Sequence, residues 1–327
     1  MPVHLHPLPL IRRFPALGEI PRASLGHFPS PIEQLPEGEV GGALWIKRDD
    51  LNAESFGGNK VRALEFLLGA VQQGDRVLTA GGEGSTHVLV TAAMARRLGA
   101  RTSAVRWAQE MNPTARLVAA RASELCERIV TVHSPIVALV RAALMGARSR
   151  VYWIPVGGTS PLGMLGHVNA ALELADQVAA GVLPLPERIV VPLGSGGTAA
   201  GLAAGCAIAG LETTIVAARV TPRVVVNRAR VLRLARAALR LIHHHTGERL
   251  PSVQRGRVHV VHDVYGGAYG RPLPAARTGA ALLERLSGVR LDESYSAKAF
   301  AAALALARRD QRRTLFWLTF DARWMRG

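Results

Sequence analysis

The sequence has few cysteines, few acidic residues and no long apolar run. Cys126 and Cys206 are its two cysteines, and each lies among apolar neighbours, so we expect two reduced core residues and no disulfide. No run of about eighteen apolar residues occurs, which excludes the usual pattern of a membrane-spanning helix. The segment 1–13 lacks the basic-then-apolar layout of a signal peptide. These absences predict a cytoplasmic protein without a membrane partner.

The shortage of acidic residues leaves a large positive charge. Asp and Glu number 24 against 40 Lys and Arg, for a formal net charge of +16. The densest stretch, 223–240, repeats arginine at helical spacing, at Arg230, Arg233, Arg236 and Arg240. Such a stripe can bind nucleic acid, but no aromatic residue alternates with these arginines to stack on bases. A solvated helix face is therefore the stronger interpretation, and a nucleic-acid partner the weaker one.

Three consecutive histidines, His243 to His245, are the candidate for a metal site. No second cluster of ligands lies nearby in sequence, so we expect the tract on a solvent-exposed loop and predict no metal.

The composition is that of a globular protein, with 49% hydrophobic and 20% charged residues. Apolar, β-branched segments predict strands at 44–47, 76–79, 102–107, 129–132, 151–155, 188–193, 213–217, 258–261 and 314–319. Ala- and Leu-rich segments predict helices at 61–73, 88–98, 114–126 and 198–209. Strands that alternate with helices of this length favour an α/β fold with parallel sheets covered on both faces.

Gly57 and Gly58 come directly before the first of these helices and permit a close approach of the backbone to a ligand. Asn59 and Lys60 follow at the mouth of the helix. The macrodipole disfavours a lysine there, and the same positive potential with burial would lower its pKa and help it act as an imine-forming amine. A surface lysine after a turn explains this segment alone equally well.

Two more glycine-rich turns precede predicted helices. GGEGSTH (81–87) could hold a carboxylate on N–H groups and hydroxyls, or Ser85 or Thr86 could simply cap the helix. GSGGT (194–198) follows a strand and could cradle a phosphate, although it lacks the ending of a nucleotide-binding P-loop.

Taken together, these segments resemble the D-cysteine desulfhydrase / 1-aminocyclopropane-1-carboxylate (ACC) deaminase family. It is a branch of the tryptophan-synthase-β-like, fold type II enzymes that use pyridoxal 5'-phosphate. The resemblance covers most of the chain. Its segments follow in the order LGHFPSPIEQLP (25–36), IKRDDLN (46–52), FGGNK (56–60), IPVGGTSPLGMLGHV (154–168), GSGGT, GGAYGRP (266–272) and LDESYSAKAF (291–300). FGGNK within that order is a specific signature.

The resemblance implies two domains, each a mostly parallel sheet flanked by helices. A small domain over 52–157 would be inserted into a large cofactor-binding domain of 1–51 and 158–327, with pyridoxal phosphate between them. It also implies a homodimer that acts on a small amino acid.

Single residues acquire roles from the same resemblance. Lys60 would bind the cofactor as a Schiff base and act as the general base, and Ser85 would lie by the substrate carboxylate or act as an auxiliary base. Tyr269 and Tyr295 match tyrosines near the substrate, although interior aromatic residues with a polar end are the ordinary alternative. The other cofactor contacts would come from Asn59, Thr86, Gly194, Ser195, Gly196, Gly197, Thr198 and Thr319.

Several positions depart from the family pattern. Thr86 stands where the family has an amide, and Phe320-Asp321 where it has a glycine pair, so that Phe320 could narrow the pocket or reshape its loop. His167 occupies a position often held by an aromatic residue. Ser296 stands where ACC deaminases have a glutamate beside the pyridine nitrogen, while Thr319 keeps a hydroxyl that could meet this nitrogen.

A hydroxyl partner leaves the ring nitrogen largely unprotonated, which suits substrates with a good leaving group on Cβ. We therefore expect a lyase that performs α,β-elimination on a D-cysteine-like amino acid, giving pyruvate, ammonia and sulfide. The alternatives are ACC ring opening, β-replacement in a specialised biosynthetic pathway, a non-catalytic homologue that binds the cofactor, and a nucleic-acid binder.

Overall fold

The computed structural model describes residues 8–147 and 151–325. Its strands are β1 (Ile32–Gln34), β2 (Leu44–Arg48), β3 (Arg76–Gly82), β4 (Arg101–Trp107), β5 (Arg128–Val132), β6 (Tyr152–Ile154), β7 (Arg188–Leu193), β8 (Thr214–Arg219), β9 (Val258–Val261) and β10 (Thr314–Leu318). Its helices are α1 (Pro9–Arg13), α2 (Glu37–Val40), α3 (Asn59–Leu67), α4 (Thr86–Arg97), α5 (Pro113–Leu125), α6 (Pro135–Ala147), α7 (Pro161–Ala179), α8 (Gly197–Ala209), α9 (Arg228–Thr246), α10 (Pro274–Ser287) and α11 (Ser296–Asp310).

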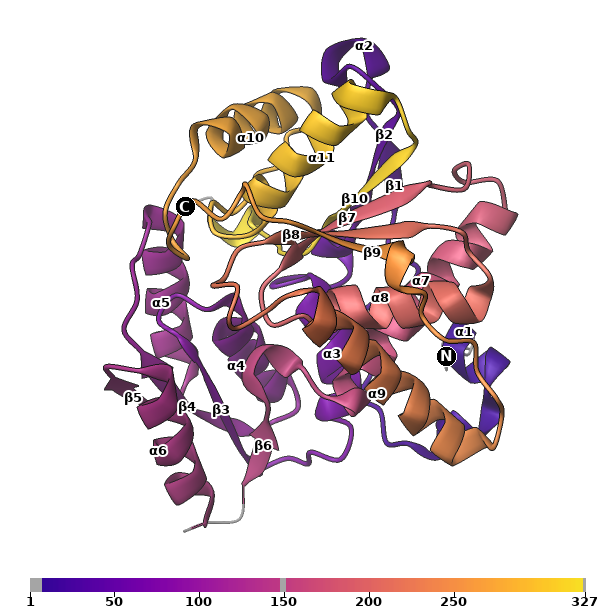
Figure 1. The fold of residues 1–327 in the computed structure, drawn as a ribbon. Coiled ribbons are helices and arrows are strands. Elements are labelled where there is room, and N and C mark those ends of the chain that lie inside the picture. Colours follow the sequence, from indigo (N-terminus) through magenta and orange to yellow (C-terminus); the bar gives the residue numbers. More distant parts are fainter. Residues whose placement is uncertain (1–7, 148–150, 326–327) are drawn as a thin grey trace.

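The larger sheet has six strands in the order β1-β2-β10-β7-β8-β9. All its pairs are parallel except the pair of β1 with β2. Strands β2, β7 and β10 are fully buried, which their apolar runs allow because helices cover both faces. Helices α7, α8 and α9 lie on one face and α10 and α11 on the other (Figure 1).

The smaller sheet has four parallel strands in the order β5-β4-β3-β6. Helices α4 and α5 cover one face and share a core with α3, and α6 covers the other (Figure 1). Each sheet thus has its own hydrophobic core, and α3 lies where the two halves meet, packed on α7.

The α/β class with mostly parallel sheets is confirmed. Each predicted strand occurs within two residues of its expected bounds, except that β3 extends to Gly82, beyond the predicted end at residue 79. The sequence-based prediction misses β1, a three-residue edge strand too short to produce an alternating pattern. The domain bounds 1–51, 52–157 and 158–327 remain a prediction, although each sheet draws its strands from the segments assigned to one domain.

Two local predictions are wrong. The helix expected over 61–73 ends at Leu67, because Gly69 passes so close to the Pro21 carbonyl that an added Cβ would lie 1.9 Å from its oxygen. His243 to His245 lie in the last turn of α9 and not on a loop. The helix continues through them because Ile242 is still buried, and it ends at Gly247, whose φ of 70° is left-handed.

None of the helices in the described part of the chain is long and apolar enough to cross a membrane. Cys126 and Cys206 are both free, as expected. Among the described residues no group of three or more His, Cys, Asp or Glu side chains could hold a metal ion.

Candidate active site

Lys60 is the second residue of α3, and the turn before it is fastened to the end of β10. Gly58 has φ 132°, and a Cβ there would lie 2.3 Å from the Thr319 carbonyl oxygen, so this position requires glycine. The Asn59 N–H donates to the same oxygen at 3.1 Å. The FGGNK segment therefore sets Lys60 against the larger sheet although α3 packs in the core of the smaller one.

The Lys60 amine lies in the space between the two halves. Its Nζ donates to the carbonyl oxygen of Gly157 at 3.0 Å. Burial disfavours the ammonium form and lowers the pKa of Lys60 to about 8. About a tenth of the amine is therefore free at pH 7, and this is the form that attacks a carbonyl or accepts a proton.

The turn 194–198 joins β7 to α8 and presents the N-terminus of that helix. Gly196 takes a left-handed φ of 101° before α8, whose first N–H groups have no partner within the helix. Asn59 Nδ2 donates to Thr198 Oγ1 at 2.7 Å, and Ser195 Oγ lies 2.6 Å from Thr159 Oγ1. The lysine turn and the glycine turn thus meet, and the latter suits an anion.

Two residues that the sequence did not single out for the site support this turn. Arg230 Nε donates to the Ser195 carbonyl at 3.2 Å, and Thr221 Oγ1 donates to the Gly194 carbonyl at 3.0 Å. Arg230 belongs to the arginine stripe interpreted above as a solvated face. Its position at the start of α9, directly after the loop that follows β8, is the signal that could have separated it from the others.

The second glycine-rich turn places Ser85 at the N-cap of α4, but its side chain makes no capping hydrogen bond. Its hydroxyl is half-buried. Thr86 is buried beside it, and His87 Nε2 lies 2.9 Å from Thr79 Oγ1. Burial, with the nearby Lys60 charge, lowers the pKa of His87 to about 3, so this imidazole is neutral and no proton donor at physiological pH.

Tyr269 and Tyr295 come together as a hydroxyl pair. Tyr269 donates to the Tyr295 hydroxyl at 2.6 Å, and the rings meet edge to face with centroids 5.2 Å apart. A Cβ at Gly194 would lie 3.2 Å from the Tyr295 ring, so this pair borders the glycine turn. Burial raises the pKa of both phenols, and they stay protonated and act as hydrogen-bond donors.

The departures from the family pattern have different outcomes. Phe320 is buried in the core shared by α3 and α4 and packs against Trp324, so its side chain fills that core and does not narrow the site. His167 Nε2 lies 3.4 Å from Thr198 Oγ1, and burial lowers its pKa well below the ordinary value. Thr319 is buried, and its backbone carbonyl accepts the Asn59 N–H of the lysine turn.

The Ser296 hydroxyl is fully buried and forms no hydrogen bond of good geometry with a described residue. It lies near the buried Asp292 carboxyl and acts to lower the pKa of that group, against the rise that burial causes. A hydroxyl held this loosely can still donate to a ligand. Ser296 follows Tyr295 directly, and Tyr295 borders the turn that suits a phosphate. An amine of lowered pKa, an anion-binding turn and a buried hydroxyl without a well-formed hydrogen bond are groups that suit a phosphorylated pyridine aldehyde.

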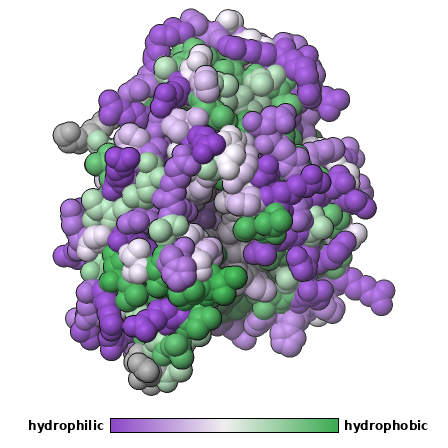
Figure 2. All heavy atoms as spheres, turned by 60° about the vertical axis from the view of Figure 1, so that its left-hand side comes forward, coloured by the Kyte–Doolittle hydropathy of each residue, from purple (hydrophilic) through white to green (hydrophobic). Residues whose placement is uncertain are grey.

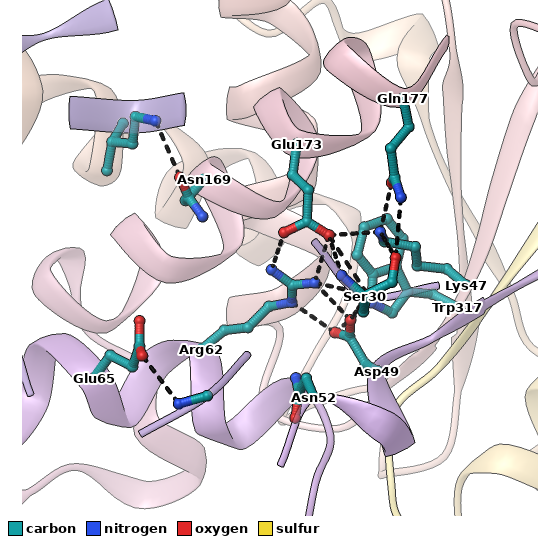
Figure 3. Close-up of polar contacts among 12 residues, drawn as sticks. Ser30, Lys47, Asp49, Asn52, Arg62, Glu65, Asn169, Glu173, Gln177 and Trp317 are labelled. Carbon is teal, nitrogen blue, oxygen red and sulfur yellow. Dashed lines mark hydrogen bonds and ion pairs between the residues drawn. The ribbon is translucent and has the colours of Figure 1, made fainter. Parts of the chain in front are cut away.

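The helix that carries Lys60 is also held by a buried cluster of charges (Figure 3). Arg62 NH2 lies 2.7 Å from Asp49 Oδ1, and Arg62 NH1 lies 2.9 Å from Glu173 Oε2. Lys47 Nζ lies 2.5 Å from Glu173 Oε1, and Trp317 Nε1 donates to Asp49 Oδ2 at 2.7 Å. These contacts join α3 to α7 and to strands β2 and β10, and thereby fix Lys60 relative to the larger sheet.

The fold and the site together define an enzyme of the fold type II pyridoxal-phosphate class. A sequence model described as "Pyridoxal-phosphate dependent enzyme" matches residues 23–319. The chain belongs to this family, and its cofactor is pyridoxal phosphate.

Named relatives match along nearly the whole chain. Nocardicin C-9' epimerase of Nocardia uniformis subsp. tsuyamanensis is 38% identical over 320 residues, 94% of each chain. D-cysteine desulfhydrase of Salmonella choleraesuis (strain SC-B67) is 34% identical over 303 residues, 88% of this chain and 89% of that one. A solved structure titled as an ACC deaminase homologue is 29% identical with a TM-score of 0.79, covering 97% of this chain and 96% of that one. These relatives are named as enzymes, which supports an enzyme over the non-catalytic alternative.

Proposed function

We propose that this enzyme catalyses α,β-elimination from a small amino acid of the D-cysteine type, releasing pyruvate, ammonia and sulfide. The observation that carries the proposal is the Tyr269–Tyr295 hydroxyl pair, 2.6 Å apart, beside the glycine turn. Because the Tyr269 hydroxyl donates its hydrogen bond to Tyr295, the Tyr295 hydroxyl can donate its own hydrogen bond to a bound molecule. The identity of 34% to a D-cysteine desulfhydrase supports the same reaction.

The chain's own residues would divide the work. Bound pyridoxal phosphate supplies the electron sink that makes the Cα proton of an amino acid acidic. The turn 194–198 with Asn59 and Thr198 would hold its phosphate, Ser296 or Thr319 would meet its ring nitrogen, and Thr86 would lie at its phenolic oxygen. Lys60 would bind it covalently and then take the Cα proton, and a positioned base of this kind contributes about 10²–10⁴-fold to the rate.

Binding of the substrate would depend on the two other predicted residues. Ser85 makes no capping hydrogen bond, so its hydroxyl can meet the substrate carboxylate. Tyr295 would donate a hydrogen bond to the leaving sulfur. A thiolate leaves without help from a strong acid, which fits phenols of raised pKa. A serine at position 296 would leave the ring nitrogen largely unprotonated, which also suits a substrate with a good leaving group on Cβ.

Epimerisation at Cα is a second candidate, favoured by the 38% identity to nocardicin C-9' epimerase over 320 residues. It requires the same proton removal by Lys60 and the return of a proton to the other face of Cα. Ser85 and Tyr295 are the hydroxyls that could return it.

One experiment separates these reactions. The cofactor-loaded protein is incubated in D2O with D-cysteine, with L-cysteine and with each enantiomer of alanine, which has no leaving group on Cβ. Sulfide and pyruvate from D-cysteine alone are the expected result, with Lys60→Ala as the inactive control. If alanine is instead inverted and deuterated at Cα, and D-cysteine releases no sulfide, the reaction is epimerisation.

The remaining alternatives have their own readouts in the same assay. ACC ring opening releases ammonia from ACC without sulfide, and β-replacement consumes D-cysteine without pyruvate when a second thiol is added. If the cofactor-loaded wild-type protein releases no sulfide from either enantiomer of cysteine, the proposed elimination is wrong.

We also propose a homodimer in the cytoplasm. The free Cys126 and Cys206 are compatible with a reducing compartment. Salt-sensitive binding of DNA, lost when the stripe at Arg233, Arg236 and Arg240 is neutralised, is the result that would revive the nucleic-acid hypothesis.

A further inference from the structure

Asn112 joins three segments of the chain through one side-chain amide. It is the N-cap of α5, and its Oδ1 accepts the Ala115 N–H at 2.8 Å. Its Nδ2 donates to the carbonyl oxygen of Gly270 at 3.1 Å and to Ser294 Oγ at 3.0 Å. The side chain is buried, with 4% of the residue exposed, so all three bonds are formed away from water.

The two partners of Nδ2 are the chain neighbours of the two tyrosines. Gly270 follows Tyr269, and Ser294 precedes Tyr295. The contact is close, because a Cβ at Gly270 would lie 2.4 Å from the carbonyl oxygen of Glu110, two residues before Asn112. The amide therefore reaches from the half built on the smaller sheet to both segments that carry the hydroxyl pair.

The loop of Tyr269 lies between β9 and α10 and belongs to no helix or strand. Lys298 of α11 donates to the carbonyl oxygens of Tyr265 at 3.0 Å and Tyr269 at 3.3 Å, and so holds the loop to the half built on the larger sheet. Arg271 forms an ion pair with Glu110 of the other half at 3.3 Å, but both of these side chains are about half exposed. Asn112 makes the buried contact between the loop and that half.

We propose that Asn112 is a positioning residue of the Tyr269–Tyr295 pair. Its amide sets the two phenol-bearing segments relative to each other, so that the hydroxyls meet at 2.6 Å only when the two halves of the chain are packed together. The catalytic consequence rests on the proposed function, in which Tyr295 faces the substrate. The positional consequence does not.

The ordinary alternative is that Asn112 only caps α5. Asn112→Asp separates the two roles, because aspartate keeps the capping oxygen and loses both donated hydrogen bonds. It also places a carboxylate oxygen against the Gly270 carbonyl. Ser294→Ala is a milder second variant that removes one of the two bonds and leaves the cap and the backbone contact unchanged.

The first test uses amide hydrogen exchange of the full-length, cofactor-loaded protein and needs no turnover. In Asn112→Asp we expect exchange across 265–271 to rise about tenfold, the equivalent of roughly 1.4 kcal/mol of lost protection. Exchange across the first turns of α5 stays unchanged because the cap remains. Ser294→Ala should show a smaller rise at 292–296. Unchanged exchange at 265–271 in both variants would overturn the proposal.

The second test is a kinetic double-mutant cycle. Asn112→Asp should lower kcat about tenfold with little change in KM, and it should have no further effect in a Tyr295→Phe background. A purely structural role would lower kcat by the same factor in both backgrounds, which contradicts the proposal. If the wild-type protein turns over no amino acid, the proposed function fails, and the exchange result alone decides the role of Asn112.

Discussion

Lys60 is an amine held largely out of water beside the Gly157 carbonyl, and its pKa of about 8 makes cofactor attachment depend on pH. Only the free amine reacts, and burial disfavours the ammonium, so the reactive fraction rises as pH rises through 8. The rate of pyridoxal phosphate attachment to cofactor-free protein should increase about tenfold from pH 7 to pH 9 and then level off. For an exposed lysine, with a pKa of about 10.4, the attachment rate would still be rising above pH 9.

Visible absorbance follows this attachment, and borohydride trapping with mass spectrometry locates it. Lys60→Ala should show neither signal. A rate that climbs steeply between pH 9 and pH 10 contradicts the lowered pKa, and trapping on another lysine contradicts the assignment.

Ser296 gives a prediction whose size depends on the cofactor. Its buried hydroxyl lies near the Asp292 carboxyl without a hydrogen bond of good geometry, so it contributes little to the stability of the cofactor-free protein. Ser296→Ala should therefore change the free energy of unfolding of the cofactor-free protein by less than about 1 kcal/mol. In the loaded protein the same change should weaken cofactor binding, if the hydroxyl meets the ring.

Thermal melts with and without pyridoxal phosphate measure both effects, and Ser294→Ala is the matched serine control, since its hydroxyl has a partner in Asn112. A destabilisation of equal size in both states would show that Ser296 acts through the Asp292 carboxyl and not through the cofactor.

The site could be predicted from the sequence only where a residue lies in a local motif. Lys60 and the turn at 194–198 stand in glycine-rich segments directly before helices, so a local pattern marks them. Asn112 and Arg230 cannot be found in this way, because Asn112 meets Gly270, 158 residues away, and Arg230 meets Ser195, 35 residues away. Such contacts depend on how the two halves pack, which no local pattern records.

The helices and strands were more predictable than the contacts between them. Buried strands such as β7 and β10 give uninterrupted apolar runs between turns, and α8 gives a run of small residues after glycines. The order of the strands in the sheets has no such signature. Strand β2 pairs with β10, the last strand in the chain, and this pairing places Thr319 against the lysine turn.

The buried charges that hold α3 give a prediction at the scale of this helix. Arg62→Met removes one cation from a cluster that leaves Asp49 and Glu173 fully buried, and loss of one partner in such a cluster costs about 3–5 kcal/mol. The urea midpoint should fall accordingly. Arg233→Met, on the exposed face of α9, should stay within about 0.5 kcal/mol of the wild type. Equal effects of the two substitutions would contradict a supporting role for the cluster.

The molecule as a whole presents an apolar surface over α6 that its own chain does not cover. Ile136 is 75% exposed, Val140 57% and Leu144 50%, and Figure 2 shows hydrophobic residues gathered on the lower part of this face. Ala138 and Ala142 point the other way, into the sheet. Arg141 is the one charged residue in this helix.

We expect a second copy of the chain to cover this surface. In a twofold interface each patch contacts the same patch of the second copy. An apolar patch is compatible with this arrangement, whereas a patch of one charge sign would be repelled by its own copy. The double substitution Val140→Glu with Leu144→Glu should convert the dimer to a monomer in sedimentation velocity, and circular dichroism should show that the monomer remains folded, because both side chains are exposed. The variant Val224→Glu, at a residue that is 92% exposed in the turn between β8 and α9, should remain dimeric. A dimer that survives the double substitution would show that the partner copy binds elsewhere. A monomeric wild-type protein would show that there is no dimer.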